Sequence, residues 1–392
     1  MISISEAISI VKNNGKPLLK KTIKSVEKAS GYILFEDVVS LINMPPFRQS
    51  AMDGYALNLH DSLSYNLVGE VKAGDGHQPN LKKGEAVRIF TGAPVPDSAN
   101  AVMMQEKVES NGNSITIEHQ IALEHNIRPL GEQVKAGNIA LKKGTKLTPA
   151  AIGYLISLGI TKVSVFKKPN IAIITTGNEL IEAGQDLSYG KIYESNSKML
   201  LSALYSLKFY DVTLNKVEDD YDKTVSALKK VINENDLVLI TGGISVGDYD
   251  FVGSALKALE VEELFYKVKQ KPGKPLFYGK KKNTQIFALP GNPAAALSCF
   301  YVYVYISLQK MMNREDLELS RVKAKSISNF EKKGDRPQFL KAIYNKGEVE
   351  ILEGQNSSML QTFALSNALV YASEEITKIE IGNTLEVIVL PI

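Results

Sequence analysis

The sequence is poor in the residues that cross-link chains or hold transition metals. Its 392 residues include one cysteine, Cys299, four histidines and no tryptophan. One thiol cannot form a disulfide framework or a thiolate metal cluster within the chain, and the histidines do not have the spacing of metal ligands. The sequence therefore predicts neither kind of site, and its low cysteine content favours a reducing cytoplasm.

An excess of charge and a long hydrophobic run are also lacking. Lys and Arg total 46 against 43 for Asp and Glu, a formal net charge of +3, which argues against nucleic-acid binding by charge alone. The most apolar stretch, residues 294–306, is shorter than the ~20 residues of a membrane-spanning helix and contains three tyrosines. We interpret it as a buried amphipathic helix. The N-terminus has no secretory signal pattern, so we predict a cytoplasmic protein with neither membrane nor nucleic-acid partners.

Composition and periodicity indicate a folded, multi-domain α/β protein. Hydrophobic residues make up 44% of the chain and charged residues 23%, values typical of folded domains. Residues 1–39 and 139–168 have helical or extended character and flank a β-rich segment, 40–138, which we predict to be an inserted domain. Residues 169–314 alternate strands and helices, as in a doubly wound domain with a mostly parallel sheet. Residues 315–392 return to short strands and predict a small β-barrel or sandwich.

Local signals place helices on both sides of the β-rich segment. Residues 3–13 put their apolar side chains on one face, and a shorter helix is predicted over 25–30. A third helix begins with Thr148 as its cap and Pro149 at its first position, and it ends at Gly159. This helical return is the reason for treating the β-rich segment as an insertion.

Glycine-rich turns follow three predicted strands of the doubly wound domain. They are TTGNE at 175–179, TGGISVGDYD at 241–250 and LPGNP at 289–293. Ligands of open α/β sheets bind outside the carboxyl ends of the strands, and glycine lets backbone N–H groups approach an anion closely. We predict a pocket for a phosphorylated or other anionic ligand at this edge. The alternative for any one turn is a tight strand–helix connection, and none of them matches a P-loop.

Two lysines lie on a proline-rich segment between the second and third turns. Lys271 and Lys274 belong to KVKQKPGKP, residues 267–275, whose prolines exclude a helix. Cations on a stiff turn suit an oxyanion or a phosphate, because less ordering entropy remains to be lost when the anion binds. The alternative interpretation is a solvated basic run, which is the usual state of a lysine cluster.

Carboxylates follow the same strands. They are Glu179 in the first turn, Asp219 and Asp220 after the next strand, and Asp248 and Asp250 in the second turn. Clustered carboxylates near a phosphate commonly hold Mg²⁺, which prefers hard oxygen ligands. The alternative is helix capping, since Asp248 and Asp250 also stand just before the next predicted helix.

Further motifs precede and follow these turns. In chain order, the sequence contains PPFRQSAMDGYA, TGAPVP, RPLGEQVKAG, TTGNEL, YESN, TGGISVGDYD, KPGKPL and LPGNP. This ordered set resembles the MoeA family of molybdopterin molybdenumtransferases, which is also seen as the C-terminal part of gephyrin, and it covers nearly the whole chain. The resemblance implies a helical N-terminal domain interrupted by a β insertion, a molybdopterin-binding α/β domain and a C-terminal β domain. It also implies a homodimer whose active site lies between the α/β domain of one subunit and elements of the other.

The resemblance also implies a reaction in molybdenum cofactor biosynthesis. Adenylylated molybdopterin and molybdate are the substrates, and a Mg²⁺-dependent step releases AMP and leaves molybdenum on the dithiolene. The implied metal ligands are Glu179 and Asp250. The expected partners are the small-molecule substrates, with transient contacts to a molybdopterin adenylyltransferase and to molybdoenzymes.

Individual positions carry the implied roles. The predicted catalytic residues are Asp53, Thr91, Glu179, Asp219, Asp250, Lys267 and Lys271. The predicted substrate- and molybdate-binding residues are Gly242, Gly243, Ser245, Asp248, Lys274, Pro275, Arg336, Ser357 and Ser358. Asp53 and Thr91 lie in the β-rich segment and are expected to reach the active site of the other subunit of the dimer.

Three positions depart from the pattern of the family. Gln133, Asn178 and Glu194 stand where the family commonly has Asp. If the Asp that the family has in place of Gln133 helps to bind metal, then in this chain either Glu132 substitutes for that Asp or the affinity for metal falls.

Two other functions stay open at this point. A molybdopterin adenylyltransferase has a single domain that resembles residues 169–312, and the flanking domains of this chain argue against it. A non-catalytic assembly scaffold would need additional partner-binding segments, and the sequence contains no linker or added domain for them. The sequence does not separate molybdate from tungstate, because the two oxyanions have the same charge and shape.

Overall fold

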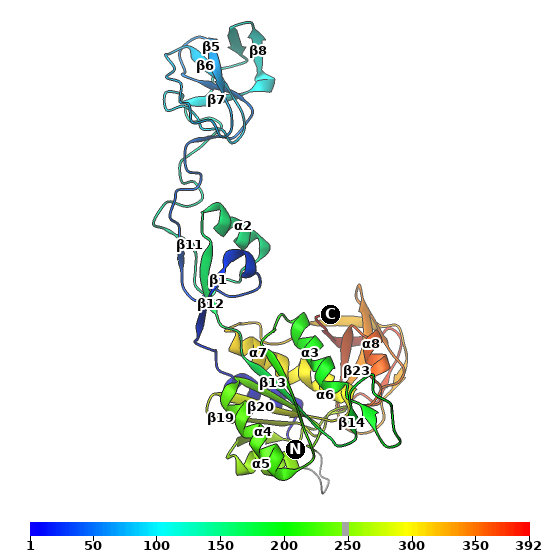
Figure 1. Cartoon of the computed structure of the whole chain (residues 1–392). Coiled ribbons are helices and arrows are strands. Elements are labelled where there is room, and N and C mark those ends of the chain that lie inside the picture. The colour runs from blue at the N-terminus through cyan, green and yellow to red at the C-terminus, as the bar shows by residue number, and fades with distance from the viewer. Residues whose placement is uncertain (245–250) are drawn as a thin grey trace. The chain divides into compact units, whose positions relative to one another are not determined.

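Two compact units make up the chain. The computed structural model describes residues 1–244 and 251–392 (Figure 1). One unit is formed by residues 21–165, and the other by residues 1–20 together with 166–392. Within the described residues, no helix combines the length and the hydropathy needed to span a membrane. The finer division into four domains stays a prediction.

A six-stranded sheet lies within the segment predicted to be β-rich. Ala56 and Val87 pack in one hydrophobic cluster, whereas their neighbours Leu57 and Ala86 pack in another. Because successive side chains of a strand point to opposite faces, the sheet buries apolar side chains on both faces. In sheet order, the strands are β7 (Ala101–Met104), β4 (Gly54–Leu57), β6 (Glu85–Ile89), β5 (Ser64–Val71), β9 (Ser114–Ile117) and β8 (Val108–Asn111).

Short strand pairs and a capped helix accompany this sheet in the smaller unit. Helix α2 (Pro149–Ser157) begins as predicted, with the Oγ1 of Thr148 accepting from the N–H of Ala151 at 3.2 Å. The helix predicted over 25–30 is only a 3₁₀ turn, η1 (Val26–Lys28). The strand pairs are β1 (Lys21–Ser25) with β12 (Lys162–Phe166), β2 (Val38–Val39) with β11 (Ile139–Leu141), and β3 (Gln49–Ser50) with β10 (Ile127–Arg128).

The larger unit is built around a doubly wound sheet, as predicted. In sheet order, its strands are β16 (Val212–Val217), β13 (Ile171–Thr176), β17 (Leu237–Thr241), β20 (Thr284–Leu289), β19 (Phe277–Lys281) and β18 (Glu262–Tyr266). The first four strands pair in parallel, and the last two add antiparallel pairs. Strands β13, β17 and β20 are buried along their entire length, as expected for parallel strands that are covered on both faces.

Helices cover the two faces of this sheet (Figure 1). On one face lie α1 (Ile4–Asn14), α3 (Asn196–Ser206), α6 (Pro293–Cys299) and α7 (Tyr305–Met311), and on the other α4 (Tyr221–Glu234) and α5 (Phe251–Ala258). Alternate residues of β13 separate the two layers, because Ile173 packs with the first set and Ile174 with the second. Helix α1 confirms the helix predicted over 3–13.

The apolar stretch 294–306 is helical but not amphipathic. It runs through α6, a π-helical turn (Phe300–Val304) and the start of α7. Nearly every side chain in it is buried, since one hydrophobic cluster joins it both to the sheet and to C-terminal side chains such as Phe339 and Leu369. The prediction of a buried helix is therefore confirmed, whereas its amphipathic character is wrong, because apolar neighbours enclose the helix on its sides.

The C-terminal strands close into a barrel, which confirms the sequence prediction. In order around the barrel, they are β21 (Arg321–Ser326), β24 (Glu348–Ile351), β23 (Gln338–Asn345), β25 (Ala368–Ala372) and β27 (Thr384–Val389). Ala342, Val349 and Val387 belong to a cluster made of barrel residues alone. Phe339 and Ile388 instead join the main cluster of the doubly wound sheet, so the barrel and the sheet share a continuous core within one unit.

Candidate active site

A cavity of about 870 Å³ opens at the carboxyl ends of strands β13, β17 and β20. Each of the three glycine-rich turns contributes to its lining, with Thr176, Gly242 and Asn292 as members. Parallel strands end at the same edge of a sheet, which is why turns that are distant in the sequence converge here. The cavity thus occupies the place that the sequence predicts for an anionic ligand.

The structure distributes the predicted site residues among three places. Those that line the cavity are Glu179, Gly242, Gly243, Lys271, Lys274, Pro275, Arg336, Ser357 and Ser358. Asp219 and Lys267 are not in the lining, and the ammonium of Lys267 lies 4.7 Å from the centroid of the Tyr266 ring. Asp53 and Thr91 belong to the smaller unit. Ser245, Asp248 and Asp250 lie outside the described residues.

The lysine turn, residues 270–275, is hydrogen-bonded to the residues just before barrel strand β23. The N–H of Lys271 donates to the carbonyl of Pro337 at 2.9 Å. Nearby, the Nη1 of Arg336 donates to the carbonyl of Gln270 at 3.1 Å. One backbone bond and one side-chain bond thus join the lysine turn to the segment that carries Arg336, and both Lys271 and Arg336 line the cavity.

A buried amide supports the lysine turn from inside. Gln270 is fully buried, and its Nε2 donates to the carbonyls of Pro272 and Gly273 at 3.1 Å each. Its Oε1 accepts from the hydroxyl of Tyr303. Both ends of the amide are therefore used within the protein, which restricts the turn and supports the prediction of stiffly presented lysines.

Gly273 allows the lysine turn to pass close to helix α6. Its φ of +84° lies in the left-handed region, and a Cβ at this position would lie 2.5 Å from the Sγ of Cys299. Burial raises the pKa of the Cys299 thiol to about 12, so Cys299 acts in packing and not as a thiolate nucleophile. Glycine is the residue that both the conformation and the close approach require.

Two buried polar atoms in the cavity lining have no hydrogen-bond partner among the described residues. They are the Oγ1 of Thr176 and the Oδ1 of Asn196. The second turn passes close to the first of them, since a Cβ on Gly243 would lie 2.7 Å from the Oγ1 of Thr176. Buried polar groups are nearly always hydrogen-bonded, so these two atoms indicate a polar ligand at this end of the cavity.

Asn196 also joins two of the turns that form the cavity. Its Nδ2 donates to the Oγ1 of Thr241 at 2.8 Å and to the carbonyl of Gly291 at 2.7 Å. Neither Asn196 nor Thr176 was predicted as a site residue from the sequence. The available signal was the YESN motif, which ends at Asn196, at the start of helix α3.

Three family profiles match this chain in order. The MoeA N-terminal region (domain I and II) matches residues 2–159, a probable molybdopterin binding domain matches 172–310, and the MoeA C-terminal region (domain IV) matches 323–390. A protein of Staphylococcus epidermidis named molybdopterin molybdenumtransferase is 32% identical over 401 residues, which cover 99% of this chain and 95% of that protein. The chain belongs to the MoeA family.

Other MoeA relatives match to a similar extent. The molybdopterin molybdenumtransferase of Haemophilus influenzae is 33% identical over 373 residues, which cover 93% of this chain and 92% of that protein. The crystal structure of a molybdopterin biosynthesis MoeA protein from Pyrococcus horikoshii has 30% identity and a TM-score of 0.83, covering 99% of this chain and 100% of that one. The family expected from the motifs and the mixed α/β fold class are both confirmed.

Among the carboxylates of this MoeA chain, Glu179 is suited to Mg²⁺. Within residues 1–244 and 251–392, no group of three or more His, Cys, Asp or Glu side chains is placed to hold a metal ion. Mg²⁺ needs fewer protein ligands, since it is commonly bound by one or two carboxylates together with substrate phosphates and water. Glu179 is exposed and lines the cavity, so its carboxylate fits that requirement.

Other acids near the turns are engaged in local structure. Asp219 accepts through Oδ2 from the N–H of Asn178 at 3.0 Å, and Asp220 caps helix α4. Glu194 is buried, and its carboxylate accepts from the N–H and the hydroxyl of Ser197 at 2.8 and 2.5 Å. The carboxylate of Glu194 therefore secures the first turn of helix α3.

Asp53 and Thr91 are bonded to each other in the smaller unit. The N–H and the hydroxyl of Thr91 both donate to the Oδ1 of Asp53, each at 2.7 Å. The backbone hydrogen bond from Thr91, followed by the side-chain one, lowers the pKa of the Asp53 carboxyl. The two motif loops that carry these residues are thereby joined, whereas their role in catalysis stays a prediction.

Replacing Asp53 by Ala removes the acceptor of both bonds. We expect the amide of Thr91 to exchange with solvent several-fold faster in Asp53→Ala, because its donor then has no side-chain acceptor. Hydrogen exchange followed by NMR measures this, with the amides of strand β5 as an internal reference. Asp53→Asn keeps one acceptor oxygen and is expected to give an intermediate rate. An unchanged rate in Asp53→Ala would contradict the proposed tie between the loops.

Proposed function

We propose that this chain transfers molybdenum from molybdate to adenylylated molybdopterin and releases AMP. Its membership of the MoeA family makes it a transferase of molybdenum cofactor biosynthesis. The observation that supports the finer proposal is the cavity, in which Lys271, Lys274 and Arg336 surround space bordered by glycine-rich turns. Both the phosphoanhydride of the adenylylated substrate and molybdate carry oxyanion charge, which such a cavity stabilises.

The cations of the lysine turn are assigned to the oxyanions. The backbone bonds of Lys271 fix the backbone of the turn before any ligand binds, so no backbone ordering entropy of the turn remains to be lost on binding. Arg336 uses one of its nitrogens on the carbonyl of Gln270 and keeps further N–H donors for oxyanion oxygens. Lys274 is exposed and lines the cavity. Ser357 and Ser358 add hydroxyl groups from the barrel side.

The pterin end of the substrate is assigned to the first and second glycine-rich turns and to Asn196. Gly242 and Gly243 bring the backbone close to Thr176, and the unpartnered oxygens of Thr176 and Asn196 can exchange hydrogen bonds with the polar edge of a pterin. In this assignment, Ser245 and Asp248 would extend the same contacts. Ser245 and Asp248 lie outside the part of the chain that the structure describes.

Mg²⁺ is assigned to Glu179 together with phosphate oxygens of the substrate, with Asp250 as the second predicted ligand. When bound, the ion would offset charge on the phosphoryl oxygens as the phosphoanhydride bond breaks. The exposure of Glu179 at the cavity supports this assignment.

The remaining parts of the proposal concern the oligomeric state, the cellular location and the protein partners. The family resemblance implies a homodimer in which Asp53 and Thr91 reach the site of the partner subunit. A cytoplasmic reaction, with transient contacts to a molybdopterin adenylyltransferase and to molybdoenzymes, completes the proposed function. Asp219 and Lys267 keep their predicted catalytic roles only as hypotheses, because neither lines the cavity.

Molybdate-dependent release of AMP tests the proposed function directly. Purified protein is incubated with adenylylated molybdopterin and Mg²⁺, with and without molybdate, and AMP is quantified by chromatography. We expect AMP to appear only when molybdate is added, with loss of activity on chelation of Mg²⁺. Parallel reactions with tungstate determine which oxyanion is preferred.

Two outcomes would point to the alternative functions. Consumption of ATP with free molybdopterin would make the chain an adenylyltransferase and contradict the proposal. Binding of adenylylated molybdopterin without turnover, with and without molybdate, would favour a non-catalytic scaffold. A standard molybdopterin adenylyltransferase in the same assay provides the positive control for the first outcome.

A further inference from the structure

Two lysines of the larger unit are buried away from carboxylates. Lys332 and Lys341 are only 6% and 3% exposed, and neither forms an ion pair with any described residue. Burying an ammonium costs free energy because water no longer solvates it, and burial lowers the pKa of Lys341 to about 8. A hydrocarbon side chain would avoid this cost, so packing alone does not account for either lysine.

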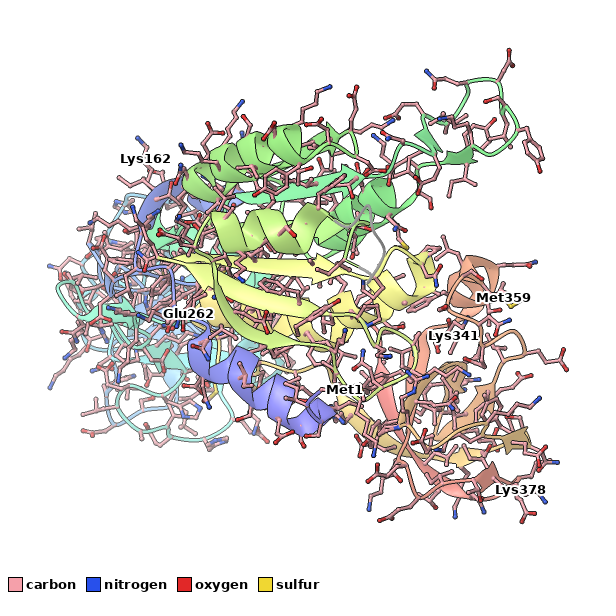
Figure 2. The ribbon with its side chains drawn as sticks, turned by 90° about the horizontal axis from the view of Figure 1, so that it is seen from below. Met1, Lys162, Glu262, Lys341, Met359 and Lys378 are labelled. Atoms are coloured by element: carbon pink, nitrogen blue, oxygen red, sulfur yellow. The ribbon has the colours of Figure 1, made fainter. Side chains whose placement is uncertain are left out.

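The ammonium of Lys341 is bonded to a single loop. It donates to the carbonyls of Gly354, Asn356 and Met359 at 2.7, 3.2 and 3.0 Å, and Lys341 and Met359 are labelled near each other in Figure 2. An ammonium has three donors, so this side chain uses its full capacity on backbone groups. The loop that these carbonyls span, residues 354–359, carries Ser357 and Ser358, both of which line the cavity.

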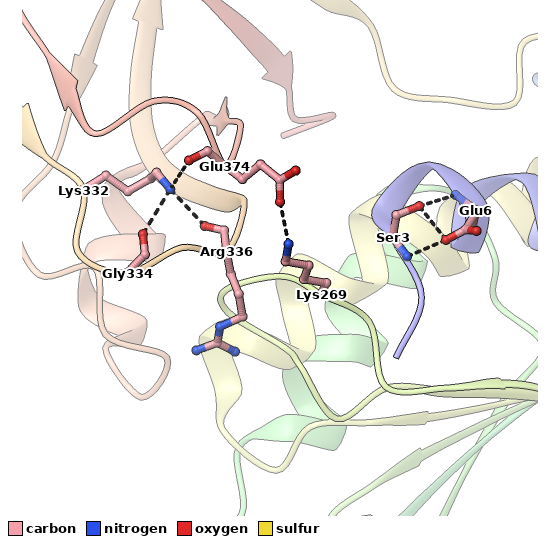
Figure 3. A network of polar contacts seen from close by, with 7 residues as sticks. All are labelled: Ser3, Glu6, Lys269, Lys332, Gly334, Arg336 and Glu374. Atoms are coloured by element: carbon pink, nitrogen blue, oxygen red, sulfur yellow. Dashed lines mark hydrogen bonds and ion pairs between the residues drawn. The ribbon is translucent and has the colours of Figure 1, made fainter.

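The ammonium of Lys332 also binds three carbonyls, two on its own loop and one on the loop that follows strand β25. It donates to the carbonyls of Gly334, Arg336 and Glu374 at 3.2, 3.2 and 3.3 Å (Figure 3). The guanidinium of Arg336 extends from this bonded backbone and lines the cavity. Neither Lys332 nor Lys341 lines the cavity itself, so both act through the residues that they hold.

We propose that Lys332 and Lys341 are positioning residues. The ammonium of Lys341 clamps one loop by three carbonyls, that of Lys332 joins two carbonyls of its own loop to one carbonyl of a second loop, and each thereby directs oxyanion contacts into the cavity. Lys332 aims Arg336, and Lys341 aims Ser357 and Ser358. This inference rests on the proposed function, because it takes those residues as contacts to molybdate or to the substrate phosphates. Neutral loop carbonyls accept from both ammonium groups, so neither clamp uses a carboxylate.

The loop clamped by Lys341 is also held from its other side. The carbonyl of Ser357 accepts from the N–H groups of Ala294 and Ala295 at 3.1 and 3.3 Å, at the start of helix α6. Its hydroxyl is 2.9 Å from the Nδ2 of Asn292, which donates to it. Lys341 thus completes a bridge from the barrel to the third glycine-rich turn, and loss of the ammonium frees one side of that bridge.

Methionine variants test the two clamps separately. Lys332→Met and Lys341→Met keep side-chain length and remove the ammonium. For each we expect KM for molybdate to rise about tenfold or more, with kcat changed less than about threefold, because ground-state contacts are misplaced while the reacting groups remain. Lys332→Arg and Lys341→Arg keep charge and donors and are expected to recover a substantial part of the lost affinity.

A third buried lysine provides the matched control. Lys168 is 7% exposed, donates to the carbonyl of Lys208, and is not in the cavity lining. We expect Lys168→Met to keep the KM and kcat of the natural chain even if its melting temperature falls. Thermal unfolding of all variants separates loss of stability from loss of positioning.

The outcomes decide between positioning and mere structure. A folded Lys341→Met or Lys332→Met with an unchanged KM overturns the proposal for that clamp, as does a loss that Lys168→Met shares. If the natural chain releases no AMP, the proposed function fails first. In that case hydrogen exchange of residues 354–359 still tests the clamp: faster exchange in Lys341→Met but not in Lys168→Met supports it, and equal exchange overturns it.

Discussion

Lys271→Ala is expected to lower kcat/KM for molybdate-dependent AMP release by about 10²–10³-fold, the usual effect of removing one preorganised donor from an oxyanion site. The backbone of Lys271 stays bonded to Pro337 whatever side chain it carries, and Gln270 supports the turn independently. The substitution therefore removes a charge from the cavity without removing the turn. Steady-state kinetics with varied molybdate measures the effect.

Lys269→Ala is the matched control for this prediction. Lys269 lies two positions earlier, is partly exposed, and forms an ion pair with Glu374 at 2.6 Å (Figure 3). It does not line the cavity, and exposed ion pairs contribute little, so its kcat/KM should stay within about twofold of the natural value. Equal losses of kcat/KM in both variants would mean that activity depends on the positive charge of the segment as a whole and not on the position of Lys271 in the cavity lining.

Gly273→Ala is expected to lower the free energy of unfolding of the larger unit by about 2–4 kcal/mol, combining left-handed strain with overpacking. The new Cβ would lie 2.5 Å from the Sγ of Cys299 and 3.0 Å from the Nε2 of Gln270. Relief requires movement of the lysine turn, so kcat/KM should fall as well. Urea unfolding followed by circular dichroism gives the stability, and the AMP assay gives the activity.

A double-mutant cycle separates strain from overlap at this position. Cys299→Ala removes the sulfur that the new Cβ would meet, so Gly273→Ala should cost about 1–2 kcal/mol less in that background. Gly253→Ala is the control, because a Cβ on Gly253 meets no atom within 4 Å in helix α5 and alanine favours a helix by up to ~1 kcal/mol. Equal stability of the natural chain and Gly273→Ala would contradict the geometric argument.

Residues of the lysine turn illustrate how far sequence reasoning reached into the site. The prolines beside Lys271 and Lys274 exclude a helix by local sterics, and both lysines line the cavity. The support that stiffens the turn was not predictable, because Gln270 acquires its role only when the hydroxyl of Tyr303 reaches it from the π-helical turn. Local sterics act within a few residues, whereas this hydrogen bond joins positions 33 apart.

Acidic residues were the least predictable part of the site. Carboxylates at strand ends serve metals and helix caps equally well, and the choice depends on which backbone N–H groups lie nearby after folding. Asp220 caps helix α4. Glu179 and Glu194 both line the cavity, but the carboxylate of Glu194 is bonded to Ser197 at the start of helix α3. A sequence pattern lists candidate ligands, but only the folded backbone selects among them.

The sequence by itself determined the family, the alternation of the four parallel strands of the doubly wound sheet with helices, and the β-rich C-terminal segment, whereas the antiparallel strands β18 and β19 and the closure of the barrel emerged only from the structure. Periodicity and turn residues encode these features locally, and strand direction then brings the three turns to one edge. Only the tertiary structure decided which polar groups share the cavity. Thr176 and Asn196 face it, and Lys332 and Lys341 hold its loops, because long-range packing sets which donors and acceptors lose water together.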